Sequence, residues 1–175
     1  MSNFVNVIQN DKSTDENDSV ILSVVIPSYN SAKLLSRCIR ALENQSAKKA
    51  YFEITVTDDG STDETLEMLE NFNARTELKL QWTTIKNSGP ATARNAGVVI
   101  TSGQWIGFLD ADVIPQPDWV ETALDLIRRN PKAGAFEGRT EVTQRGRATP
   151  FTHQTGNIEG GRYPTCNLIV RKNLA

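Results

Sequence analysis

Cysteine and histidine are scarce in this 175-residue chain, which contains two cysteines and one histidine. Cys38 and Cys166 have neither the spacing of metal ligands nor that of a disulfide framework, so we expect free thiols in a reducing compartment. The N-terminus has no positive region followed by an apolar core, and the longest apolar-rich run, residues 20–26, is far shorter than a membrane span. These absences predict a cytoplasmic protein and leave a peripheral association with a membrane open.

The sequence also lacks the common glycine-rich nucleotide loops and any basic block. Neither G-x-G-x-x-G nor G-x-x-x-x-G-K-[ST] occurs, which argues against dinucleotide-dependent oxidoreductases and P-loop enzymes. Lysines and arginines are scattered and the formal net charge is −2, so nucleic acid is not an expected partner. With 38% hydrophobic and 23% charged residues, a chain of this length fits one globular domain.

What the sequence does contain is an alternation of strand-like apolar runs and segments with helical spacing. The strand-like runs cover residues 20–26, 51–57, 78–85 and 105–109. The third run alternates polar and apolar residues, as a half-exposed strand does. Helical segments follow the runs, at about residues 31–45, from 62, and at 90–100 and 117–130. This alternation predicts an α/β fold with a Rossmann-like, doubly wound, mostly parallel sheet and helices on both faces.

The apolar run 105–109 ends in two carboxylates, Asp110 and Asp112, separated by one alanine. Ligands of open α/β sheets bind beyond the carboxyl ends of the strands, which is where these side chains would lie. Two carboxylates about 5 Å apart repel by roughly 3 kcal/mol at an effective dielectric near 20, and a cation would relieve that repulsion. Mg²⁺ or Mn²⁺ fits, because such ions are often held by one or two carboxylates together with water and phosphates. The alternative is a turn whose aspartates cap backbone amides.

Three polar clusters follow strands, and a parallel sheet would bring them to one edge. These clusters are residues 27–30, 58–63 and 110–112. A carboxylate at Asp59 could accept a hydrogen bond from a base N–H, the loop near Tyr29 could flank the ring, and a metal could neutralise a diphosphate. The cluster 58–63 alone is also a favourable turn and helix cap. Convergence of all three favours a nucleoside-diphosphate site.

Four segments resemble those of family 2 glycosyltransferases, which have the GT-A fold. They are Val-Val-Ile-Pro-Ser-Tyr-Asn (24–30), Val-Thr-Asp-Asp-Gly-Ser-Thr-Asp (56–63), Asn-Ser-Gly-Pro-Ala-Thr-Ala-Arg-Asn-Ala-Gly (87–97) and Phe-Leu-Asp-Ala-Asp (108–112). The resemblance covers residues 20–130 well. It extends more weakly to 166–172, which looks like the family's later strand before the acceptor helix.

The resemblance implies roles for individual residues. Three of them would line the nucleotide pocket: Pro27, Tyr29 and Asn30. Asp59 would recognise the base, with Asp58 beside it. Asp110 would contact the ribose or a metal-bound water, and Asp112 would ligate the metal that bridges the diphosphate. Arg94 would lie on the helix over the site, and its alternative is a solvated or salt-bridged helix arginine.

The expected domain organisation has three parts. Residues 1–19 form a flexible leader, 20–130 the half that binds the sugar donor, and 131–175 the start of a truncated acceptor half. In similar enzymes the general base is an acid in a later motif, so we expect it beyond Ala175. The remaining candidates in the second half are Glu137, Glu141, Glu159 and His153, and the glutamates are expected at the surface. Apolar surface near Leu168 and Val170 could support self-association.

The leading hypothesis is a metal-dependent glycosyltransferase. It would move a sugar from a nucleotide diphosphate, with UDP as the first guess, to a hydroxyl of a glycan, lipid or other acceptor, with inversion as the resemblance implies. One alternative is a module that binds the sugar donor without turnover. Another is a sugar nucleotidyltransferase, which would usually carry a glycine-rich basic signature after the first strand; residues 27–33 are not one.

Overall fold

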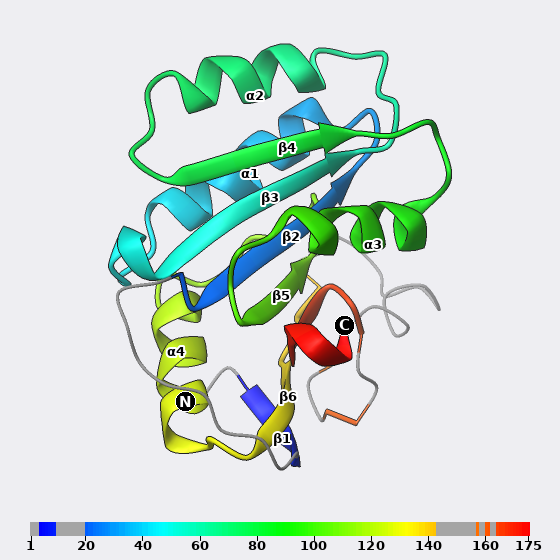
Figure 1. Ribbon diagram of the computed structural model, residues 1–175. Helices are drawn as coiled ribbons and strands as arrows, with labels where there is room; N and C mark the ends of the chain where they lie inside the picture. The colour runs from blue at the N-terminus through cyan, green and yellow to red at the C-terminus, as the bar shows by residue number, and fades with distance from the viewer. Residues whose placement is uncertain (1–3, 10–19, 143–156, 158–159, 162–163) are drawn as a thin grey trace.

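The computed structural model of the chain describes residues 4–9, 20–142, 157, 160–161 and 164–175. Within these residues, seven strands form one sheet in the order β1-β6-β7-β5-β2-β3-β4 (Figure 1). The strands are β1 (Phe4–Gln9), β2 (Leu22–Ser28), β3 (Phe52–Asp58), β4 (Lys79–Thr84), β5 (Trp105–Leu109), β6 (Ala133–Gly138) and β7 (Asn167–Arg171).

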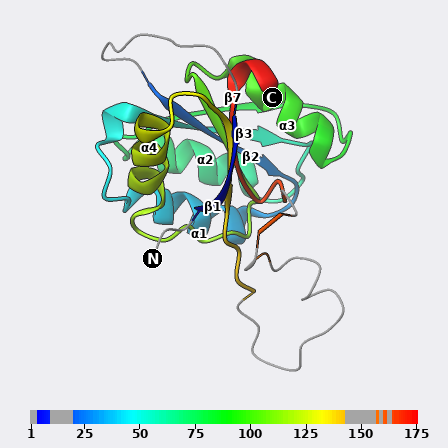
Figure 2. The same ribbon diagram turned by 90° about the horizontal axis from the view of Figure 1, so that it is seen from below.

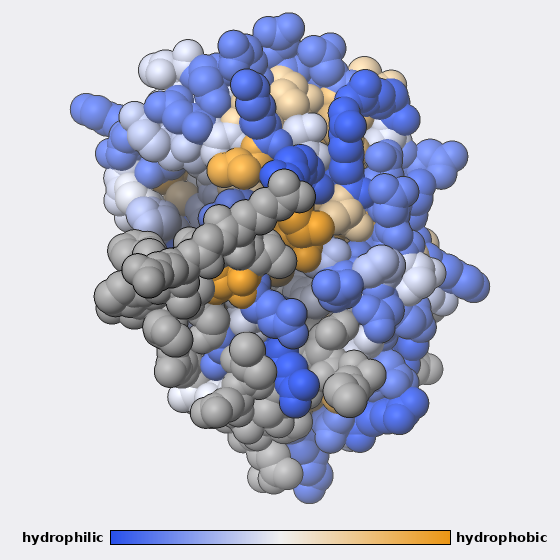
Figure 3. Space-filling view, turned by 180° about the vertical axis from the view of Figure 1, so that it is seen from behind, coloured by the Kyte–Doolittle hydropathy of each residue, from blue (hydrophilic) through white to orange (hydrophobic). Residues whose placement is uncertain are grey.

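Helices cover both faces of the sheet, as expected. They are α1 (Ala32–Glu43), α2 (Thr65–Asn73), α3 (Pro90–Ile100) and α4 (Trp119–Arg129), with short 3₁₀ turns at Lys49–Tyr51 and Lys172–Leu174. Figure 2 shows α1, α2 and α4 on one side of the sheet and α3 on the other. The side away from α3 is mainly hydrophilic at its surface, with a few hydrophobic patches (Figure 3).

The parallel part of the sheet is built from β2, β3, β4 and β5. Every residue of β2 and β3 is buried, which explains why their sequences are nearly continuous apolar and β-branched runs. Strand β4 is half exposed at the edge, in agreement with its alternating sequence. The strand order reverses after β4, because α3 carries the chain back across β3 and β2 to β5. A topological switch point therefore lies between β2 and β5, where such sheets bind ligands.

The second half of the sheet is mixed rather than parallel. Strand β7 runs antiparallel to both β5 and β6, so β6 points in the same direction as β5. Strand β1 pairs antiparallel with β6 at the edge. The expectation of a flexible leader is therefore wrong for residues 4–9. They include the large apolar residues Phe4, Val5, Val7 and Ile8. The edge of β6 supplies their backbone hydrogen-bond partners, and the pairing cannot be read from the local sequence.

Two networks of polar side chains lie at the edge of the sheet where the parallel strands begin. The buried Glu53 accepts hydrogen bonds from the Ser23 hydroxyl at 2.6 Å and from the Ser102 amide and hydroxyl at 2.6 and 2.8 Å. Burial raises the pKa of the Glu53 carboxyl, but hydrogen bonds from Ser23, Ser102 and Gly103 outweigh burial and hold that pKa below its usual value. This network ties the turn before β5 to β2 and β3.

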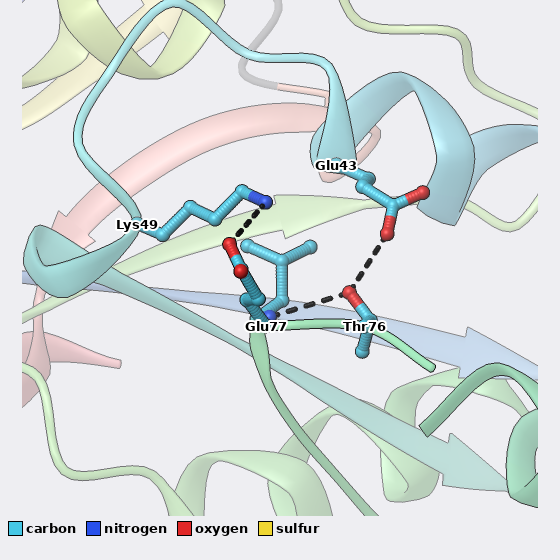
Figure 4. A network of polar contacts seen from close by, with 5 residues as sticks. Glu43, Lys49, Thr76 and Glu77 are labelled. Atoms are coloured by element: carbon cyan, nitrogen blue, oxygen red, sulfur yellow. Dashed lines mark hydrogen bonds and ion pairs between the residues drawn. The ribbon is translucent and has the colours of Figure 1, made fainter. Parts of the chain in front are cut away.

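The second network joins the end of α1 to the loop before β4 (Figure 4). The Thr76 hydroxyl donates to a Glu43 carboxylate oxygen at 2.9 Å and accepts from the Leu78 amide at 3.2 Å. An exposed ion pair, 3.3 Å between Lys49 and Glu77, lies beside it. Neither network is near the switch point.

No helix in the described part of the chain combines the length and the apolar character needed to cross a membrane.

Candidate functional site

Asn30, a residue expected to line the nucleotide pocket, joins the loop that follows β2 to the loop that follows β3. Asn30 has a left-handed backbone (φ 47°), and its side-chain oxygen accepts from the amides of Thr62 at 2.7 Å and Asp63 at 3.3 Å. The backbone amide of Asn30 donates to the Ser61 hydroxyl at 2.8 Å. The side-chain carbonyl of Asn30 therefore fixes the loop after β2 against the loop after β3.

Asp63 extends the same connection to two helices. Its carboxylate accepts from the Ala32 amide in the first turn of α1 at 3.1 Å. It also accepts from the amide and hydroxyl of Thr65, at the start of α2, at 3.1 and 2.5 Å. Burial raises the pKa of Asp63, but these hydrogen bonds outweigh it and lower the pKa below its usual value. Asp63 lies at the end of the motif 56–63, but the motif alone did not indicate that it links the first turns of α1 and α2.

Pro27 and Tyr29 differ in what they can offer a ligand. Pro27 lies in β2 opposite Thr57 of β3 and is buried. Tyr29 directly follows β2 and is 49% exposed. An aromatic ring left this open at a strand end is available to stack on a flat ligand.

Asp58 and Asp59 both cap backbone amides, as the alternative interpretation of this motif expected. Both oxygens of Asp58 accept from the Ser61 amide at 3.2 Å. One oxygen of Asp59 accepts from the Ser88 amide at 2.7 Å and the other from the Gly89 amide at 2.8 Å. Asp59 thus holds the loop that leads into α3. Each carboxylate oxygen can accept a second hydrogen bond, so this anchoring leaves capacity for a ligand N–H.

Arg94 and Asp110 form an ion pair, with 2.5 Å between the Arg94 Nη2 and the Asp110 Oδ1. Arg94 projects from α3, and Asp110 follows β5, so the pair spans the switch point. The Arg94 side chain is 15% exposed and the Asp110 side chain 38%. The salt-bridged alternative for Arg94 is therefore the observed one, and the arginine offsets part of the negative charge of the Asp-x-Asp turn.

Asp112 is exposed, whereas Ala111 between the two aspartates is buried. Burial, followed by the charges of Asp112 and Asp110, raises the pKa of the Cys38 thiol to about 12. The pKa of Cys166 is also raised, first by burial, with contributions from both aspartates. Two thiols from distant parts of the sequence therefore lie within the negative field of this turn.

The residues at the turn fit a hard divalent cation. Asp110 and Asp112 supply carboxylate oxygens, which such ions prefer. Among the described residues there is no group of three or more histidine, cysteine or acidic side chains able to enclose a metal. Two carboxylates are nevertheless the usual protein share when water and phosphate oxygens complete the shell.

The candidate bases of the second half are not equivalent. Glu137 was expected at the surface, and this is wrong: it is fully buried, and its carboxylate accepts from the Asn157 side-chain amide at 2.7 Å and the Gly161 backbone amide at 2.6 Å. Its position at the end of the inner strand β6 explains the burial, and the sequence carried no motif that could reveal it. Glu141 is exposed. Glu159 and His153 lie outside the described residues.

The sheet order and the helices on both faces define the class of protein: an α/β protein with the fold of glycosyltransferases. The family model "Glycosyl transferase family 2" matches residues 23–173. The chain therefore belongs to glycosyl transferase family 2, as its motifs predicted, and the GT-A assignment of the fold is confirmed.

Two relatives illustrate the range of the family. The chain is 30% identical over 155 residues to the glycosyltransferase AglE of Haloferax volcanii, covering 88% of this chain and 48% of that protein. It is 38% identical over 104 residues to validoxylamine A glucosyltransferase of Streptomyces hygroscopicus, covering 59% of this chain and 25% of that enzyme. The chain thus spans about half the length of the first relative and a quarter of the second.

Two solved structures resemble the chain in three dimensions. The crystal structure of S. aureus TarS 1–349 in complex with UDP-GlcNAc matches with a TM-score of 0.72 and 28% identity, over 89% of this chain and 46% of that one. The mannosyltransferase PcManGT from Pyrobaculum calidifontis, in complex with GDP-Man and Mn²⁺, matches with a TM-score of 0.63 and 24% identity, over 72% and 36%.

Proposed function

We propose that this chain binds a UDP-sugar together with a divalent cation and contributes to transfer of the sugar to a hydroxyl acceptor, with inversion. The observation that carries the proposal is the order of three neighbouring parallel strands: Asp59 follows β3, the exposed Tyr29 follows β2, and the Asp110–Asp112 turn follows β5. The similarity to TarS, which has been solved with UDP-GlcNAc, supports a uridine nucleotide as the first ligand to test.

The base would be recognised by Asp59 and Tyr29. The carboxylate of Asp59 is fixed by two amide donors, so its direction is preorganised before a ligand arrives. It can accept from a ring N–H such as that of uracil, and a ring that presents only acceptors would be rejected. Asp58, Pro27 and Asn30 act in this proposal by shaping the pocket.

Asp112 and Asp110 would hold Mg²⁺ or Mn²⁺, with Asp112 as the principal ligand. Asp112 is exposed, while Asp110 already pairs with Arg94. When bound, the cation would supply Lewis-acid stabilisation of the leaving diphosphate. Arg94 would add a fixed positive charge beside it.

A second candidate function is binding of the sugar donor without transfer. Burial and two hydrogen bonds remove Glu137 from the candidate bases, which favours this alternative. Incubation with UDP-sugars and assay for released UDP, with and without hydroxyl acceptors, distinguishes it from transfer. The proposal also retains the cytoplasmic location expected from the two free thiols.

Calorimetry of the chain with UDP, GDP and ADP, each with and without Mn²⁺, tests the binding proposal. We expect UDP to bind most tightly and Mn²⁺ to strengthen that binding by at least about a hundredfold. Equal affinity for the three nucleotides would contradict the role of Asp59, and an unchanged affinity without Mn²⁺ would contradict the metal site.

A further inference from the structure

A buried carboxylate lies at the same edge of the sheet as the candidate site but on different strands. Glu137 is the next-to-last residue of β6, which points in the same direction as β5, and its two carboxylate oxygens accept hydrogen bonds from Asn157 and Gly161. The backbones of Asn157 and Thr140 also exchange two hydrogen bonds, of 2.8 and 3.1 Å. Asn157 is thus held by both Glu137 and Thr140, and Gly161 is held by Glu137.

Asn167 connects this cluster to the Asp-x-Asp turn. Its side-chain amide donates to the Arg139 carbonyl at 2.9 Å, and its oxygen accepts from the Trp119 indole at 2.8 Å. Asn167 occupies the space beside Gly138, where an added Cβ would lie only 2.2 Å from it. In the sheet it stands opposite Leu109, the residue before Asp110. Asn167 therefore lies one strand away from the turn that carries the candidate metal ligands, and Glu137 lies two strands away.

The order of strands along this edge gives the cluster a place relative to a bound nucleotide. Asp59 follows β3, Tyr29 follows β2, Asp110 and Asp112 follow β5, and then come the start of β7 and the end of β6. If the base, ribose and diphosphate of the proposed donor lay along β3, β2 and β5, the transferred sugar would lie above β7 and β6. The Glu137 cluster lies at that end.

We propose that Glu137 is a positioning residue for the sugar of the donor, because it fixes the backbone at Asn157 and Gly161 beside the Asp-x-Asp turn. This inference rests on the proposed function. The backbone needs such an anchor: Gly160 and Gly161 both have left-handed φ angles, 81° and 83°, in a segment where glycine gives the chain wide conformational freedom. Glu137 itself is buried and contacts no ligand in this proposal.

The test compares the dissociation constants of UDP, UDP-glucose and UDP-N-acetylglucosamine with Mn²⁺ for the wild-type chain and Glu137→Ala. We expect the variant to bind at least one of the two UDP-sugars about tenfold more weakly and to bind UDP within twofold of wild type. Glu137→Gln should restore most of the affinity. Its amide oxygen can accept from the Gly161 amide, and its nitrogen can donate to the Asn157 Oδ1, which is buried and has no other hydrogen-bond partner among the described residues.

Gly161→Ala provides a second variant that leaves the buried carboxylate intact. Among the residues that the structure describes, no atom lies within 4 Å of the added Cβ, so the strain expected is that of the backbone conformation at φ 83°. It should also weaken a UDP-sugar selectively, and Glu70→Ala, an exposed acid on α2, serves as the control without effect.

Equal weakening of UDP and both UDP-sugars in Glu137→Ala and Gly161→Ala would overturn the positioning role, as would unchanged affinity for all three. Failure of the wild-type chain to bind UDP would instead overturn the proposed function, and this inference with it.

Discussion

The two edges of the parallel sheet use carboxylates in different ways. At the edge where strands begin, Glu53 is buried and accepts three hydrogen bonds from Ser23 and Ser102. At the edge where strands end, Asp112 is exposed, and Asp110 has a side chain that is 38% exposed. Carboxylates that are enclosed by donors stabilise the fold, whereas those left open at the switch point are available to a ligand.

Asp59 shows that this division is not simply one edge against the other. It lies at the ligand edge, yet it is 5% exposed and holds the start of α3 through two amides. The comparison therefore predicts three kinds of behaviour: loss of binding alone at Asp112, loss of stability alone at Glu53, and loss of both at Asp59.

The largest effect is expected for Asp112→Asn. Loss of even an outer-shell partner of a metal ligand costs about 10–100-fold, so loss of a principal ligand should weaken Mn²⁺-dependent UDP binding by at least about a hundredfold, or about 2.7 kcal/mol. Titration calorimetry measures this. The melting temperature should stay at the wild-type value because the side chain is exposed, and UDP affinity unchanged by the substitution would eliminate this residue as the metal ligand.

Glu53→Ala should destabilise the chain by about 3 kcal/mol without changing UDP affinity, because it leaves three hydrogen-bond donors without their acceptor. Urea unfolding measures the free energy. Glu53→Gln should cost only about 1 kcal/mol, since its amide oxygen keeps two of the hydrogen bonds and the Ser102 hydroxyl can turn to accept the third.

The same pair of variants tests a pH dependence. The pKa of Glu53 is lowered in the folded state, so its contribution to stability is fully present above the unfolded value, near 4.5, and is lost as the pH falls through the lower folded value. Wild type should therefore lose more stability than Glu53→Gln between pH 5 and pH 3, on the order of 1 kcal/mol. Parallel curves for the two proteins would contradict this assignment.

Asp59→Ala should moderately lower both the free energy of unfolding and the affinity for UDP. Two amides before α3 lose their acceptor, at a cost of about 1–2 kcal/mol in unfolding free energy. UDP should bind about tenfold more weakly, while pyrophosphate with Mn²⁺ should be much less affected, because one charge-assisted hydrogen bond to the base contributes about 1.5 kcal/mol. Equal losses for the two ligands would assign Asp59 to phosphate binding or to structure alone.

The smallest effect is expected for the exposed ion pair of Lys49 and Glu77 in Figure 4. A double-mutant cycle with Lys49→Ala and Glu77→Ala should give a coupling energy below about 0.5 kcal/mol, because solvent screens such pairs. Thr76→Ala removes two hydrogen bonds of the same network. It should lower the free energy of unfolding more than Lys49→Ala or Glu77→Ala does. A coupling above 1 kcal/mol would show that this edge depends on surface charge.

Much of the fold could be predicted because its information is local. The strand β5 is apolar throughout, β2 and β3 are rich in apolar and β-branched residues, and Leu35, Ile39 and Leu42 recur at helical spacing on the buried side of α1. Strand β1 could not be predicted in the same way. Its partner, β6, lies more than a hundred residues away, and pairing with an edge depends on a surface that only the assembled sheet provides.

The sequence by itself determined which polar residues follow the strands β2, β3 and β5, and the parallel pairing of these strands then required the residues to share an edge. Only the tertiary structure decided what each one does there. Asp59 and Asp112 are the same residue type in similar motif positions, but the loop at Ser88 and Gly89 encloses one and leaves the other in solvent. A glutamate such as Glu137 is usually expected at the surface. It is buried here because β6, the strand that carries it, lies between β1 and β7. Burial depends on which chain segments meet, and those contacts are made by residues far apart in sequence.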